Sequence, residues 1–113
     1  MDVELISLRI DFIIKQIDLA ISDLSDVKIE DFHENSLLAR GVSFSLEQVC
    51  EHTSKLRRKL EGDWNNVPWD KIYNMRIILA HMYTKVDTNK VYDIVKKDLP
   101  ELREQLLVIK ASL

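Results

Sequence analysis

The sequence has very few residues that cross-link or break a chain: one cysteine, two glycines and two prolines among 113 residues. A single cysteine, Cys50, cannot form an internal disulfide, which is typical of proteins from a reducing compartment. So few glycines and prolines leave little turn chemistry for a many-stranded sheet, whereas 31% charged residues suit helices that face water. Composition therefore predicts an all-α fold, and the length suits one domain covering residues 1–113.

Signals for membranes, metals and several common enzyme classes are also missing. No apolar run approaches the roughly 20 residues that cross a bilayer, and the acidic N-terminus lacks the basic region of a signal peptide. We therefore expect a cytoplasmic protein with no membrane contact. No Gly-rich phosphate loop, nucleophile elbow or paired-carboxylate motif is present. No second cysteine or histidine stands at ligand spacing from Cys50 and His52, so we expect no metal and no cofactor.

Apolar residues recur at helical spacing along the whole chain. In the first segment one stripe has alternating steps of three and four residues, and a second stripe lies beside it. A helix with apolar residues on two sides needs cover on both, so the second stripe indicates a partner subunit. The first stripe consists of Val3, Ile6, Ile10, Ile13, Ile17, Ala20 and Leu24, and the second of Leu5, Leu8, Phe12 and Leu19.

The next segment can form one helix or two. Gly41 is a candidate break, and the four residues that start at Ser45 match a capping box that would begin a new helix. However, the apolar stripe that starts at Phe32 keeps its phase across Gly41. A break usually resets that phase, so we predict one long helix over residues 30–61. Gly41 then lies inside it, at a cost of about 1 kcal/mol relative to alanine.

One clear loop, EGDWNNVP, precedes the remaining helices. Pro68 begins a third helix over residues 68–83. Asp87 or Thr88 caps a short helix that runs to Lys97, and Asp98 with Pro100 opens a last helix. These elements predict an antiparallel bundle of about five helices. Its inward residues here are Trp69, Ile72, Met75, Leu79 and Met82 in the third helix, and Leu99, Leu102, Leu106, Ile109 and Leu113 in the last.

The stretch MRIILAHMY carries three side chains that a packed helix does not need. Arg76 and Tyr83 are seven residues apart and share a helix face, whereas His81 lies about 140° around from Arg76. A histidine moves protons near neutral pH, and an arginine binds phosphate and stabilises its charge. The trio suits metal-free RNA cleavage by a 2′-hydroxyl, or phosphate binding alone. Equally, Arg76 can be a surface ion-pair residue and His81 a helix-end histidine with a satisfied hydrogen bond.

Basic residues concentrate in the half of the chain that holds this stretch. Residues 1–54 contain 4 Lys and Arg against 11 Asp and Glu, whereas residues 55–113 contain 12 against 8. Arg57 and Arg58 end a predicted helix, where cations favour the macrodipole or contact an RNA backbone. Tyr73 and Lys85 flank the stretch and are further candidate RNA contacts, although ordinary packing is the more usual role for Tyr73.

The same stretch resembles the R-x4-H-x-Y motif of HEPN-domain proteins of the HepT type, the toxin halves of HepT/MntA toxin–antitoxin pairs. The resemblance extends to the flanking segments PWDKIYNMR and VDTNKVYDIVKKDLPELREQL, over residues 64–106. It implies a homodimer in which two motif helices meet in a cleft. One departure stands out, because the family usually carries a polar residue directly after the arginine and this chain has Ile77.

The resemblance also implies a role for each motif residue. Arg76 stabilises the phosphate and His81 acts as the acid or base in metal-independent RNA cleavage. Tyr83 is the residue to which a cognate MntA-type nucleotidyltransferase antitoxin transfers AMP groups, silencing the toxin. We therefore expect a ribonuclease toxin. The alternatives are a non-catalytic HEPN subunit that binds substrate or nucleotide for that transferase, and a purely structural helical dimer.

Overall fold

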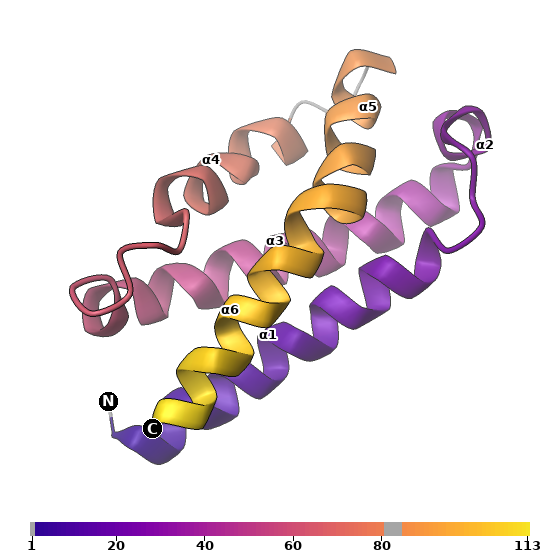
Figure 1. The fold of residues 1–113 in the computed structure, drawn as a ribbon. Coiled ribbons are helices and arrows are strands. Elements are labelled where there is room, and N and C mark those ends of the chain that lie inside the picture. Colours follow the sequence, from indigo (N-terminus) through magenta and orange to yellow (C-terminus); the bar gives the residue numbers. More distant parts are fainter. Residues whose placement is uncertain (1, 81–84) are drawn as a thin grey trace.

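A computed structural model describes residues 2–80 and 85–113, with the side chains of 85 and 86 left out. All the regular elements in these residues are helical, as composition predicted, and Figure 1 shows their order. The elements are α1 (Val3–Asp23), α2 (Ile29–Glu34), α3 (Ser36–Leu60), α4 (Trp69–Ala80), α5 (Lys85–Asp93), the π-helical turn η1 (Ile94–Asp98) and α6 (Leu99–Ser112).

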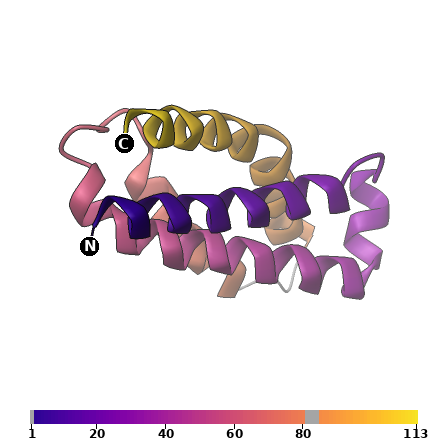
Figure 2. The same ribbon diagram turned by 90° about the horizontal axis from the view of Figure 1, so that it is seen from below.

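The long helices α1 and α3 lie side by side, and α6 crosses over them (Figures 1 and 2). Asp2 caps α1 by accepting a hydrogen bond from the Leu5 amide at 2.8 Å. The predicted first stripe is confirmed from Ile6 to Leu24, whereas Val3 is exposed. In the second stripe Leu5, Leu8 and Leu19 are exposed, and each is more than 40% accessible.

The prediction of one helix over residues 30–61 is wrong at one residue. The chain leaves helical geometry at Asn35, with φ −101° and ψ 91°, and α3 starts directly after it. The Asn35 side chain accepts a hydrogen bond from the Leu38 amide at 3.0 Å, and so replaces a backbone bond that a continuous helix would supply. A break of one residue barely disturbs the apolar phase, and Phe32 stays fully buried. Gly41 lies inside α3, as predicted.

The predicted break before the last helix is also wrong. α5, η1 and α6 follow one another without a gap, and Leu99 donates its amide hydrogen to the carbonyl of Ile94, five residues back. Pro100 has no N–H, and its ring would clash with the carbonyl four residues earlier. A π turn widens the helix at this point and relieves the clash, so the proline bends the helix instead of ending it. Leu113, predicted to face inward, is 43% exposed.

The loop after α3 positions α4 against it. The indole of Trp69 donates a hydrogen bond to the carbonyl of Trp64 at 2.9 Å, which fixes the start of α4. Trp69, Ile72 and Met75 are buried, as predicted, and Leu79 is half-buried. The last predicted residues of this helix, 81–83, lie outside the described residues, Met82 among them. None of the described helices is long and apolar enough to cross a membrane.

Candidate functional site

Arg76 lies on the exposed side of α4. Its guanidinium carbon stands 5.8 Å from the centre of the Tyr73 ring, one turn earlier, at cation–π distance. Across residues 2–80 and 87–113 no carboxylate forms an ion pair with Arg76. An arginine with no carboxylate partner keeps its donors available for a phosphate. Tyr73 is 52% exposed, so the two predicted residues share one surface.

A cavity of about 250 Å³ opens beside Arg76, between α3 and α4. Its α3 wall carries Glu47, Gln48 and Glu51, and its α4 wall carries Arg76 with Leu79 and Ala80. Glu51 is bound to Lys55 at 3.4 Å, four residues further along α3. The cavity is therefore polar on one wall, and its single described cation is Arg76. Ala80, which lines this cavity, is the last described residue of α4, and the predicted catalytic residue His81 is the next residue in the sequence.

Three of the predicted site residues lie outside what the structure describes. His81 and Tyr83 are not described, and only the backbone of Lys85 is, as the first residue of α5. Their roles therefore stay predictions. Ile77, which follows Arg76, is 62% exposed and contributes nothing to the core.

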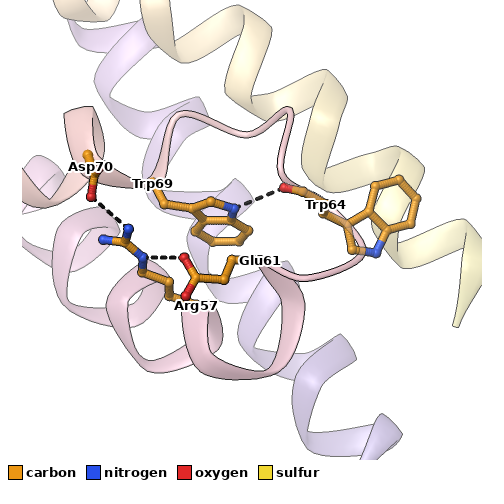
Figure 3. A network of polar contacts seen from close by, with 5 residues as sticks. All are labelled: Arg57, Glu61, Trp64, Trp69 and Asp70. Carbon is orange, nitrogen blue, oxygen red and sulfur yellow. Dashed lines mark hydrogen bonds and ion pairs between the residues drawn. The ribbon is translucent and has the colours of Figure 1, made fainter.

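Arg57 and Arg58 stand at the far end of α3, away from this cavity. Figure 3 shows the Arg57 guanidinium between two carboxylates: Nε donates to Glu61 at 2.7 Å and Nη2 donates to Asp70 at 2.6 Å. These hydrogen bonds raise the pKa of Arg57. Arg57 thus ties α3 to the start of α4, and RNA would have to compete with both carboxylates for it. Arg58 is exposed.

Cys50 and His52 have structural surroundings. The Cys50 thiol donates to the carbonyl of Ile72 at 3.3 Å, and burial raises its pKa to about 12, so it is not a ready nucleophile. The Nδ1 atom of His52 accepts a hydrogen bond from Arg9 at 2.7 Å, and its ring lies 4.6 Å from that of Phe12. Burial and the Arg9 charge lower the pKa of His52. No group of three metal-ligating side chains occurs in the described part of the chain.

The sequence alone did not predict the residues of the α3 wall. Glu47, Gln48 and Glu51 sit on the polar side of a long helix, a pattern typical of any solvated face. Only the register of α3 against α4 shows that they face Arg76. One signal was available: the α4 motif needs a neighbouring wall, and a polar i, i+4 pair on the preceding helix is a natural candidate.

Comparison with known proteins links this geometry to a family. The family model described as "Ribonuclease HepT-like" matches residues 13–109. The chain is 29% identical over 108 residues to a Methanocaldococcus jannaschii protein named "Gamma-glutamylcyclotransferase and putative RNase", covering 96% of this chain and 49% of that protein. It thus spans about half the length of that relative.

A second relative matches nearly end to end. The chain is 28% identical over 97 residues to a protein of Caldanaerobacter subterraneus subsp. tengcongensis named "Putative RNase", covering 86% of this chain and 87% of that protein. A further M. jannaschii protein with the same description is 26% identical over 84 residues, covering 74% of this chain and 77% of that protein. No solved structure matches the chain.

Proposed function

The chain belongs to the HepT-like ribonuclease family, and we propose that it is the RNA-cleaving toxin of a toxin–antitoxin pair, with Arg76 and His81 as its catalytic residues. The observation that carries this proposal is the exposed guanidinium of Arg76. It meets a polar cavity, forms no ion pair with a described carboxylate, and lies five residues before a histidine. If Arg76 were only a surface ion-pair residue, we would expect it to have a carboxylate partner.

The proposed reaction is an attack by an RNA 2′-hydroxyl on the adjacent phosphate. The bond from the 2′-oxygen to phosphorus forms as the bond from phosphorus to the 5′-oxygen breaks, leaving a 2′,3′-cyclic phosphate and a free 5′-hydroxyl. A base takes the 2′ proton and an acid gives one to the leaving oxygen. His81 serves in one of these roles, and Arg76 stabilises the charge that grows on the phosphate oxygens.

A symmetric dimer supplies the second proton-transfer group, because each copy brings its own His81. Exposed apolar residues on α3 and α4, the two helices that form the Arg76 cavity, support such an interface. Phe44 lies one turn before Gln48 on α3 and is 58% exposed, and on α4 Tyr73 and Ile77 are 52% and 62% exposed. Exposed apolar side chains gathered around a polar cavity mark an interaction surface. A two-fold axis near this cavity would bury them and bring two Arg76 side chains together.

Regulation by a nucleotidyltransferase partner is consistent with the spacing of the motif in the sequence. Tyr83 follows Arg76 by seven residues, about two helical turns. Transfer of AMP groups to its hydroxyl would place bulk and negative charge close to a site that must accept an RNA phosphate. Steric block and charge repulsion would both oppose RNA binding, so a single modification silences the site.

The second candidate is a non-catalytic HEPN subunit that binds substrate or nucleotide for the transferase, and Ile77 favours it. This residue stands directly after Arg76, where an orienting polar group is expected, and its exposed side chain offers no hydrogen bond. A site without that group can hold a phosphate through Arg76 and yet orient it poorly for attack.

Cleavage of tRNA or mRNA by the purified protein, without divalent metal, tests the proposal. We expect 2′,3′-cyclic phosphate ends, and a loss of rate of at least 100-fold, on the order of one general acid or base, in His81→Ala. Arg76→Ala should lower the rate similarly, whereas Arg103→Ala, at an arginine of α6 that pairs with Asp18, should leave it within about threefold. No cleavage, with stable binding to the transferase, would establish the subunit reading. Cleavage that survives His81→Ala would exclude His81 from the mechanism.

A further inference from the structure

A groove runs along the other flank of α4, between this helix and the C-terminal helix. We call it the α4–α6 groove. It consists of a cavity of about 200 Å³ beside α6 and an open cavity of about 530 Å³ beside α5 and η1. Lys71, Met75 and Asp98 line both cavities, so the two are parts of one groove. Neither cavity includes Arg76, and the groove is separate from the proposed nuclease site.

One ion pair spans the groove at its middle. Lys71 Nζ lies 3.0 Å from Asp98 Oδ1, and the two side chains are 63% and 37% exposed. An exposed pair of this kind is worth on the order of 0–1 kcal/mol, so a ligand displaces it at little cost. The floor beneath is apolar: Met75, Leu99 and Leu102 line it, and Ile78 borders the wider cavity. Methionine adapts its shape to different partners, which suits a binding floor.

The π turn lies where the two cavities meet, because Asp98 is its last residue. Figure 2 shows the C-terminal helix bending as α6 (yellow) passes into η1 and α5 (orange). The bend lets α5 contact α4 while α6 crosses α1, so α4 and α6 diverge. Pro100 causes the π turn and the bend, and so opens the groove. π turns often occur at functional sites.

Two charged side chains of opposite sign lie on either side of the central ion pair. Lys90 lines the cavity beside α5 and Glu101 lines the cavity beside α6. Neither forms an ion pair with another described residue, whereas Asp98 is held by Lys71 and Asp93 lies 3.9 Å from Lys97. Eleven residues of helix separate Lys90 from Glu101, which is about 17 Å at 1.5 Å per residue. This is the length of about three helical turns.

We propose that the α4–α6 groove binds an amphipathic helix of a partner protein. That helix has apolar anchors at i, i+3 or i+4, and i+7, an acidic residue that meets Lys90 and a basic residue that meets Glu101. The cavity beside α6 is smaller than the roughly 300 Å³ at which ligand pockets usually begin, and it suits one anchoring side chain. A helix satisfies its own backbone hydrogen bonds, so it can lie on an apolar floor that offers few polar partners.

Two designed helical peptides with the same apolar anchors test this proposal. One has an acidic and a basic end, and the other has two acidic ends. Because a helix can bind in either direction, a simple exchange of the ends would not discriminate. We expect the native protein to bind the first peptide about fivefold more tightly, as one favourable ion pair of about 1 kcal/mol implies. Glu101→Lys gives the groove two basic ends and should reverse the preference.

A matched control variant and the location of the bound peptide decide the outcome. Glu104→Lys makes the same charge change three residues further along α6, outside the groove, and should keep the native preference. Affinities follow from the fluorescence anisotropy of labelled peptide, and NMR shifts locate the bound peptide. The proposal is overturned if neither peptide binds, if shifts map to α1 and α3, or if Glu104→Lys reverses the preference. Self-association that Glu101→Lys abolishes would assign the groove to a second copy and overturn it too.

Discussion

The proposed dimer makes its sharpest prediction at Phe44. This side chain is 58% exposed and packs little against its own subunit, so Phe44→Ala should leave the fold intact. Fully burying a phenylalanine is worth about 1.5–3 kcal/mol, and the exposed share of it therefore about 1–2 kcal/mol. A two-fold interface holds two copies, so the dimer should lose about 2–3.5 kcal/mol. The dissociation constant should then rise about 30- to 400-fold.

A second variant separates interface burial from a general loss of apolar surface. Val108 on α6 is 57% exposed, nearly the same as Phe44, but lies far from the Arg76 cavity. Val108→Ala should leave the dissociation constant within about twofold. Sedimentation velocity over a concentration series measures both variants against the native protein, and urea unfolding verifies that each remains folded.

The same measurement can refute the reasoning. If Phe44→Ala dimerises like the native protein, the surface of α3 around Phe44 is not part of an interface. If the native chain is a monomer at all concentrations, the composite site cannot form, and the second proton-transfer group must come from elsewhere. If Val108→Ala weakens the dimer as much as Phe44→Ala, a different face carries the contact.

Four further predictions concern Asn35, Gly41, His52 and Arg57. Asn35→Ala should lower the free energy of unfolding by about 1 kcal/mol, because the N-cap hydrogen bond to Leu38 is lost, whereas Asn35→Ser should not lower it. Gly41→Ala should raise the free energy of unfolding by about 0.5–1 kcal/mol, because the added methyl meets only Asp23 Oδ2 at 4.0 Å. Urea unfolding measures all three variants. Because the pKa of His52 is lowered in the folded state, the unfolded chain binds more protons. The free energy of unfolding should therefore fall as pH drops below about 6.5, and His52→Gln should flatten that dependence between pH 7.5 and 5.5. Arg57→Ala should lower the urea midpoint only slightly, because exposed ion pairs contribute little to stability, and should leave RNA affinity within about twofold in a filter-binding assay.

Sequence periodicity predicted which faces are buried better than where helices stop. The stripe of α1 depends only on spacing, and six of its seven members are buried. The break at Asn35 depends on one side chain capping one amide, and it leaves the stripe in phase on both sides. Phase continuity therefore carries no information about a break of a single residue. The positional preference of asparagine for the N-cap was the signal to use.

At Pro100 the sequence predicts a helix boundary that the structure does not have. A proline is normally a sign that a helix begins or ends, and the sequence alone offers no reason to expect otherwise. Here the buried residues on both sides of the proline, Val95 and Leu102 among them, pack into the same core. Their burial holds the helix together across the proline, and the π turn absorbs the steric conflict. Tertiary packing thus overrides a strong local preference.

The residues of the candidate site also differ in how well the sequence predicts them. Arg76, His81 and Tyr83 are neighbours in the chain, so their grouping depends on one helix and is visible in the sequence. Glu47, Gln48 and Glu51 reach the cavity only through the pairing of α3 with α4, stabilised by contacts such as Arg57 with Asp70. No local pattern records that register. Sequence reasoning therefore finds the half of a site that lies on one element and misses the half that packing brings to it.

Ile77 links the two proposals about this site. Ile77 is 62% exposed beside the proposed RNA site, so core packing gives no reason for it to be apolar, and a hydrated nuclease cleft would favour a polar residue there. A dimer interface would favour isoleucine, because each copy could bury it against the other. An apolar residue in this position would therefore strengthen the proposed contact between subunits while offering no hydrogen-bonding group to the proposed cleft. The stronger the dimer proves to be, the more the chemistry must rest on Arg76 and His81 alone.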